Sequence, residues 1–215
     1  MAKYLSINEA LGLVKTGDYI VTGLGAAEGR EFMTNLHTIA DRVKDVMVSN
    51  CLPMGAYEFI ANPEYKDSFT TEGWFYTPVL RKAQANGNVS FIPNHLHLAA
   101  TKRLFYRKPD IYVGIASTPD KHGYVSLSLS NTYEMKMIKD AKIVILEINP
   151  NAPRTFGDVQ LHIDDVDYVV EVDYPIPELA DAEPNEKDLI IGKIIADMIN
   201  DGDCIQLGIG GIPNA

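Results

Sequence analysis

Two stretches of this chain repeat one short pattern, and the repeat limits the folds that the sequence can adopt. Val14–Gly25 reads Val-Lys-Thr-Gly-Asp-Tyr-Ile-Val-Thr-Gly-Leu-Gly, and Ile199–Gly210 reads Ile-Asn-Asp-Gly-Asp-Cys-Ile-Gln-Leu-Gly-Ile-Gly. Each copy predicts the end of a helix, a Gly-Asp turn, a short apolar strand and a Gly-x-Gly loop. We therefore expect two units that open alike, the second of which has barely begun at Ala215. The matching residues are Gly17, Asp18, Ile20, Gly23 and Gly25 in the first copy and Gly202, Asp203, Ile205, Gly208 and Gly210 in the second.

Between the two copies, predicted strands alternate with predicted helices. The strands are continuous apolar runs, which is typical of a parallel sheet covered by helices on both faces. The sequence thus predicts an α/β fold with an open, mostly parallel sheet in residues 1–180, followed in 181–215 by a linker helix and the first strand and loop of a second, similar domain. The expected strands are 19–22, 46–51, 89–92, 111–116, 124–129 and 142–148, and the expected helices are 6–17, 30–43, 78–85, 132–139 and 186–200.

Composition narrows the possible partners and the compartment. With 46% apolar residues the chain can form a core, and its net charge of −10 disfavours nucleic acid and anionic membranes as partners. No apolar run is long enough to span a bilayer and the start lacks a signal peptide, so we expect a cytoplasmic protein. Cys51 and Cys204 lie far apart in apolar runs, which predicts two packed, reduced thiols.

The two glycine loops are the first candidate ligand sites. Ligands of open α/β sheets bind beyond the carboxyl ends of the strands, where glycine lets backbone N–H groups approach an anion. Neither loop fits the dinucleotide-binding pattern, because Glu28 and Pro213 interrupt it. Gln206 is polar within an apolar run and needs a partner; a hydrogen bond across the sheet and a ligand contact are equally consistent with the sequence.

Other polar motifs are weaker candidates. Arg154 offers a guanidinium that could bind a carboxylate or phosphate, or pair with Asp158 or Asp164. His122 lies in a turn after an apolar run, and His162 lies beside three acids in what reads as a solvated loop. His95 and His97 have no third ligand nearby, so we expect no metal site.

Four ordered motifs together resemble the acetyl-CoA hydrolase/transferase family, and within it the 4-hydroxybutyrate and butyrate:acetate CoA-transferases. The motifs are 119–128, 153–158, 162–171 and 202–215. The resemblance implies a cytoplasmic, homo-oligomeric (dimeric) two-domain enzyme whose halves share one α/β fold. It further implies that this chain corresponds to the amino-terminal domain plus the first strand of the catalytic domain.

The resemblance also implies the chemistry and its substrates. A glutamate attacks an acyl-CoA thioester, CoA then forms a glutamyl-CoA thioester, and a short-chain carboxylate such as acetate, butyrate or 4-hydroxybutyrate accepts the CoA. That glutamate is expected after Ala215, so no catalytic residue is assigned within this chain. The CoA thioester and pantetheine are expected at Gln206, Gly208, Ile209, Gly210, Gly211 and Ile212, and Gly23, Leu24, Gly25 and Glu28 are expected to face substrate.

Some positions and some functions stay open. Leu24 and Gly29 stand where many relatives have histidine and proline, which leaves the substrate unassigned. The alternatives are an acetyl-CoA hydrolase, a non-catalytic CoA-binding module and a sugar-phosphate isomerase of similar fold. Because a single helix and strand cannot cover Ile205, Leu207 and Ile209, we expect residues 185–215 to dock on the first domain or on a partner chain.

Overall fold

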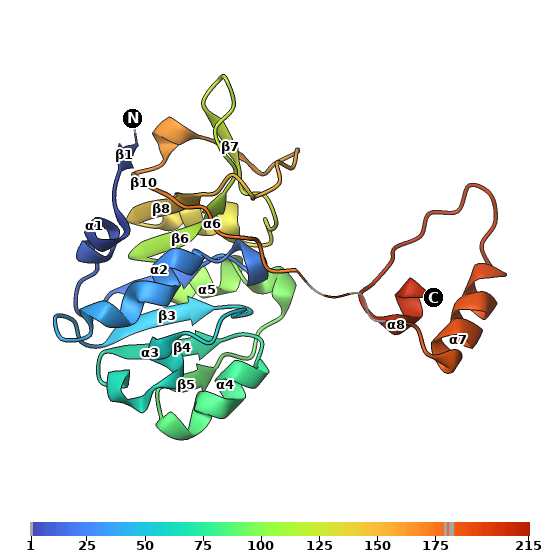
Figure 1. Cartoon of the computed structure of the whole chain (residues 1–215), viewed down its shortest axis with the longest axis horizontal. Helices are drawn as coiled ribbons and strands as arrows, with labels where there is room; N and C mark the ends of the chain where they lie inside the picture. The colour runs from blue at the N-terminus through green and yellow to red at the C-terminus, as the bar shows by residue number, and fades with distance from the viewer. Residues whose placement is uncertain (1, 179, 181–182) are drawn as a thin grey trace. The chain divides into compact units, whose positions relative to one another are not determined.

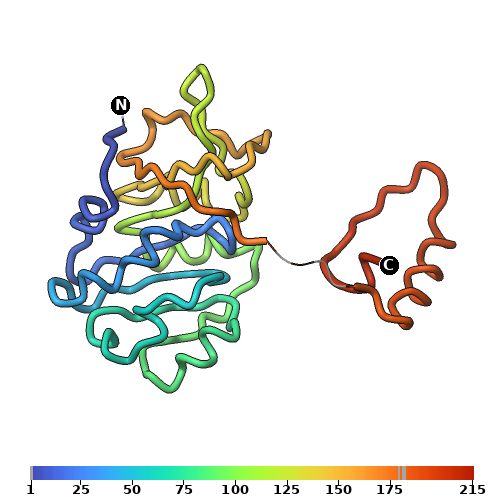
Figure 2. Tube along the Cα trace, in the orientation of Figure 1, coloured from blue at the N-terminus to red at the C-terminus, as the bar shows by residue number. Residues whose placement is uncertain are grey.

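The computed structural model describes residues 2–178, 180 and 183–215, which form two compact units (Figures 1 and 2). Unit 1 is Met1–Ile176 and unit 2 is Pro177–Ala215. The domain boundary predicted between residues 180 and 181 adjoins residues 181–182, which lie outside the described part of the chain.

Unit 1 contains a parallel sheet of eight strands among its described residues, in the order β1-β10-β8-β6-β2-β3-β4-β5 (Figure 1). Every neighbouring pair in this sheet runs parallel, which confirms the predicted α/β class. The strands are β1 Lys3–Tyr4, β2 Tyr19–Thr22, β3 Val46–Asn50, β4 Phe69–Gly73, β5 Val89–Phe91, β6 Ile111–Ala116, β8 Ile143–Ile148 and β10 Tyr168–Glu171.

Helices cover both faces of the sheet, which explains why its central strands are mostly apolar. Successive side chains of a strand point to opposite faces, so Ile20 of β2 packs with one apolar cluster and Val21 with another. The first cluster includes residues of α1 Ile7–Gly12, α2 Arg30–Asn35, α3 Glu58–Ala61 and α4 Pro78–Ala83; the second includes residues of α6 Glu134–Asp140 and packs against α5 Thr101–Tyr106.

The helices are shorter than the sequence predicts. Helix α1 begins at a capping box of Ser6 and Glu9 but ends at Gly12 rather than at the predicted Gly17, because glycine disfavours helix continuation. The predicted helix 30–43 is divided into α2 and a 3₁₀ turn at Leu36–Ile39.

A second, two-stranded sheet is antiparallel. Its strands are β7 Tyr124–Ser126 and β9 Gln160–His162. Serine and apolar residues alternate along 124–129, and the strand that forms there pairs in antiparallel fashion. Ser126 and Ser128 are nevertheless buried, because Thr155 and the Pro153 carbonyl bond their hydroxyls.

Unit 2 departs from its prediction. Helix α7 Glu186–Ala196 begins at a capping box of Asn185 and Asp188, and α8 Gly211–Asn214 follows a turn. Residues 203–208 form no strand, although the repeat predicted one, because no strand among the described residues of this unit offers the backbone partners that a sheet needs. Cys204 is consequently exposed, not packed as expected, and none of residues 183–215 is buried.

Within the described residues, no helix combines the length and the hydropathy that a membrane span requires.

Candidate functional site

The chain reverses its direction across the sheet between β2 and β6. From β2 the connections run through β3 and β4 to β5, whereas from β6 they run through β8 to β10 on the other side. Loops that leave two neighbouring parallel strands in opposite directions open a crevice at their carboxyl ends, where ligands of such sheets bind. The loop Gly23–Gly29 leaves β2 at this point, and the loop that starts at Ser117 leaves β6.

The loop after β2 requires glycine at two places. A Cβ on Gly23 would lie 2.2 Å from the carbonyl oxygen of Ala27, and Gly25 has a φ of +58°. In the part of the chain that the structure describes, the backbone N–H groups of Gly25 and Ala26 have no hydrogen-bond acceptor. Two adjacent N–H donors of the loop at the switch point are therefore left without a partner in that part of the chain.

Three buried glutamates fix this loop by hydrogen bonds, and Glu134 bonds the beginning of the loop. Glu134 Oε1 accepts from Leu24 N at 2.9 Å, and Glu134 Oε2 accepts from Tyr133 N at 2.9 Å. The hydroxyl of Tyr133 donates in turn to Thr22 O at 2.8 Å. Leu24 is thus bound to α6 through its backbone, whichever side chain stands there.

Glu28, predicted to face substrate, is buried, with 2% of its surface exposed. It accepts hydrogen bonds from Asn50 Nδ2 at 2.9 Å, from Met54 N at 3.3 Å and from the Tyr57 hydroxyl. Burial raises the pKa of its carboxyl, and the Tyr57 and Asn50 bonds oppose that rise. Glu28 therefore joins the loop after β2 to the loop after β3.

Glu147 holds the end of the loop. This fully buried residue of β8 accepts from Phe32 N at 2.7 Å, from Glu31 N at 3.1 Å and from the Tyr174 hydroxyl at 2.6 Å. Burial raises the pKa of the Glu147 carboxyl to about 7, although these bonds favour its charged form. The signal for it in the sequence was a single acid within the apolar run of 143–148.

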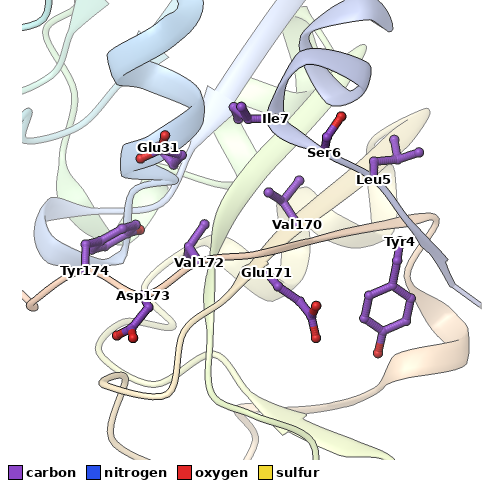
Figure 3. Close-up of a pocket in the computed structure, with 10 residues that line it drawn as sticks. All are labelled: Tyr4, Leu5, Ser6, Ile7, Glu31, Val170, Glu171, Val172, Asp173 and Tyr174. Carbon is purple, nitrogen blue, oxygen red and sulfur yellow. The ribbon is translucent and has the colours of Figure 1, made fainter.

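One pocket of about 600 Å³ lies at the carboxyl ends of β1 and β10 (Figure 3). Carboxylates of Glu31, Glu171 and Asp173 line it, and none of its ten described lining residues is a lysine or an arginine. Such a lining repels phosphates and carboxylates. Tyr174 stands at this pocket, but its hydroxyl is already bonded to Glu147.

A second concavity, of about 580 Å³, lies beyond β3, β4 and β5 and is called here the aromatic groove. The described residues that line it are Leu52, Trp74, Phe75, Tyr76, Thr77, Arg81, Phe91, Asn94 and Leu96. The groove adjoins the glycine loop, since a Cβ on Gly25 would lie 3.7 Å from Leu52. Its only formal charge among the described lining residues is that of Arg81, so it suits an anion with an apolar body.

The residues predicted to bind CoA all lie in unit 2. Gln206, Gly208 and Ile212 line a concavity of about 280 Å³ with residues of α7, and Ile209 is strongly exposed. Gln206 lies in no strand, so the hydrogen bond across a sheet that was one alternative for it is not made. Gly210 and Gly211 begin α8.

Arg154 has a structural position. Its Nη2 donates to Thr118 O at 2.7 Å and to Tyr124 O at 2.9 Å, and its acidic neighbour is Asp120 at 3.9 Å, where the sequence suggested Asp158 or Asp164. It therefore holds the turn after β6.

The histidines form no ligand cluster. The ring of His162 contacts the His122 carbonyl at 3.1 Å, and His95 and His97 stack on each other. Across the described residues, no group of three or more His, Cys, Asp or Glu side chains could hold a metal ion.

Comparison with known proteins identifies relatives along the whole chain. Residues 1–180 match the sequence model of the acetyl-CoA hydrolase/transferase N-terminal domain. The chain is 33% identical to a succinyl-CoA:cyclohexane-1-carboxylate CoA transferase of Geobacter metallireducens (99% of this chain, 48% of the relative). It is 34% identical to a probable butyrate:acetyl-CoA coenzyme A-transferase of Syntrophomonas wolfei (100% and 48%).

A solved structure shares the fold of this chain. The crystal structure of RipA from Yersinia pestis is 27% identical and superposes with a TM-score of 0.89, covering 99% of this chain and 52% of that one. The chain spans about half the length of the curated relatives that it matches.

Proposed function

Because the chain belongs to the acetyl-CoA hydrolase/transferase family, we propose that it supplies the first domain of an enzyme that moves CoA between a short-chain acyl-CoA and a carboxylate. Acids of the acetate, butyrate or 4-hydroxybutyrate type are the proposed acceptors, as the names of several relatives suggest. The proposed enzyme is a cytoplasmic homodimer that uses CoA as a substrate and needs no metal ion.

One observation in the structure supports this proposal above the others. The glycine loop presents the free N–H groups of Gly25 and Ala26 at the switch point, directly beside a groove whose one charge is the cation of Arg81. In an acidic protein these donors are what an acyl oxygen or a carboxylate would meet. The three buried glutamates fix the loop, so the donors need little reorganisation when a substrate binds.

The proposed reaction passes CoA through the enzyme. A glutamate carboxylate attacks the thioester carbon, the C–S bond breaks, and CoA leaves as a thiolate from a mixed anhydride. The thiolate then attacks the glutamyl carbonyl carbon, which releases the first acid and leaves a glutamyl-CoA thioester. The same steps in reverse with the acceptor acid form the new acyl-CoA. In this proposal the glutamate lies outside residues 1–215, and Gln206 with Gly208–Ile212 contacts the CoA thioester and pantetheine.

Two measurements test the proposal on the product of the complete reading frame that contains residues 1–215. Incubation with acetyl-CoA and butyrate should yield butyryl-CoA and acetate. Incubation with acyl-CoA alone should raise the intact protein mass by one CoA less one water. A complete protein that gives neither product overturns the proposal, and free CoA formed without an acceptor favours the hydrolase instead. The 215-residue protein serves as a control that should give no exchange, because it lacks the proposed nucleophile.

A further inference from the structure

The aromatic groove contains two buried polar atoms that the protein leaves unbonded. Among the described residues, Trp74 Nε1 and Thr77 Oγ1 have no hydrogen-bond partner, and both side chains line the groove. Trp74 is 7% exposed, its indole packs on Tyr133 with ring centroids 5.0 Å apart, and its Nε1 exposes less than 1 Å². A buried donor without a partner costs free energy, and a ligand oxygen that Nε1 meets when the indole turns toward the groove would remove that cost.

The charge of the groove indicates which kind of ligand oxygen it binds. The guanidinium of Arg81 is fixed through its Nε, which donates to Tyr76 O at 2.9 Å, while no acid of the described residues pairs with its remaining nitrogens. An arginine with free Nη donors binds a carboxylate in bidentate fashion. Asn94 adds an amide to the same lining. The polar part of the groove thus fits one carboxylate.

The apolar side chains that line the groove indicate what kind of acid fits there. Phe75, Phe91 and Leu96 are about half exposed along the groove, a large apolar surface for a soluble protein to leave open. Phe91 is held by an edge-to-face contact with Tyr76. A volume of about 580 Å³ is in the range of sites that hold whole small molecules, and acetate would leave most of it to water.

We propose that the aromatic groove is the binding site for the acid substrate and that it selects a monocarboxylic acid with a bulky apolar body over acetate. The carboxylate accepts hydrogen bonds from Arg81 and, once the indole has turned toward the groove, from Trp74 Nε1. The body of the acid packs on Phe75 and Phe91. The role of this acid as the CoA acceptor rests on the proposed function; its binding does not.

The test uses the 215-residue protein and its single tryptophan. Trp74 lines the groove, so its fluorescence reports occupancy directly, and calorimetry gives the affinity. The probe is 4-methylpentanoate, compared with acetate and with the neutral 4-methylpentanamide. Each extra buried methylene adds about 0.8 kcal/mol, so we expect 4-methylpentanoate to bind at least about tenfold more tightly than acetate. The neutral amide has the same apolar body but offers Arg81 no charge, so we expect it also to bind at least about tenfold more weakly than the acid.

Variants locate the site. Arg81→Gln and Trp74→Phe, the latter followed by calorimetry, should each weaken 4-methylpentanoate binding about tenfold, as expected for a hydrogen bond to a charged group. Lys82→Gln is the matched control, because it removes the same charge from the next, exposed residue of α4, which does not line the groove. Its affinity should equal that of the native protein.

Several results would overturn this inference. They are equal affinity for acetate and 4-methylpentanoate, equal affinity for acid and amide, an equal loss in Lys82→Gln and Arg81→Gln, and displacement of the acid by CoA alone. Because binding is measured without turnover, intact binding in a protein that fails to exchange CoA contradicts only the proposed function. Active exchange without this binding contradicts only the groove.

Discussion

The hydroxyl of Tyr174 donates a hydrogen bond of 2.6 Å to Glu147 Oε2, and this bond joins the chain after β10 to the buried end of β8. The same carboxylate accepts from the first backbone N–H groups of α2. One buried acid therefore sets the position of three segments, and its protonation state affects all of them.

Glu147 should make stability depend on pH. Its pKa is raised from 4.5 to about 7 by burial, so between these values the folded protein holds a proton that the unfolded chain has lost. The stabilisation is complete below pH 4.5 and is lost as pH rises through about 7. At about 1.4 kcal/mol per pKa unit it amounts to roughly 3 kcal/mol. Urea unfolding from pH 4.5 to 8 measures it.

Glu147→Gln provides the comparison for that measurement. The amide does not titrate, so the difference in unfolding free energy between native protein and variant should change by roughly 3 kcal/mol across the interval. Other acids, such as Glu28, whose pKa is also raised, contribute equally to both proteins and cancel. A difference that is flat with pH would show that Glu147 does not titrate there.

Tyr57→Phe should destabilise the protein by about 1–3 kcal/mol, because it removes one of the donors that satisfy the buried carboxylate of Glu28. It should also raise the pKa of Glu28 further, since the lost bond favours the charged form. Chemical denaturation of the variant measures the first effect. Tyr106→Phe is the control, because Tyr106 is exposed and should tolerate the change. Identical midpoints for both variants would contradict the role of Tyr57.

Gly23→Ala should destabilise the protein by about 1–3 kcal/mol, the range for a side chain forced into occupied space. The new Cβ would meet the carbonyl oxygen of Ala27 at 2.2 Å, so the loop must move. Gly12→Ala is the matched control: nothing lies within 4 Å of its Cβ, and it sits at the exposed end of α1. It should gain about 0.5–1 kcal/mol. Thermal unfolding separates the two, and a stable Gly23→Ala protein would show that the loop is not tightly packed.

The strands that the sequence predicted most accurately are those that can be recognised without any knowledge of tertiary contacts. β2 and β6 begin and end at the predicted residues, because both of their faces are covered and every position is apolar or small. β4 was not predicted, because its sequence contains the charged residue Glu72 and so does not read as an apolar strand. The charge is accommodated by an ion pair with Arg103 of α5, a contact that appears only when the chain is folded.

The site followed the same division. The glycine loop was located from its spacing, since Gly-x-Gly after a strand indicates a tight turn whose backbone N–H groups can approach a ligand. Glu134 and Glu147 were not assigned, because each accepts from a backbone N–H group more than a hundred positions away, as Glu134 does from Leu24. The second copy of the repeat shows where the sequence pattern alone misleads. The pattern recurs around Ile205, yet residues 203–208 form no strand, because a strand needs a neighbouring strand to pair with.

The two cysteines should react at very different rates with a thiol reagent such as 5,5′-dithiobis(2-nitrobenzoate). Burial raises the pKa of Cys51 to about 12, so at pH 8 it is a buried thiol with almost no thiolate. Cys204 is exposed. We expect one thiol per chain to react in native buffer and two in 6 M guanidinium chloride. Cys204→Ser should abolish the native reaction, whereas Cys51→Ser should leave it unchanged. Two rapid native thiols would mean that the sheet opens at the end of β3, and none would mean that Cys204 is covered by the first unit or by a partner chain.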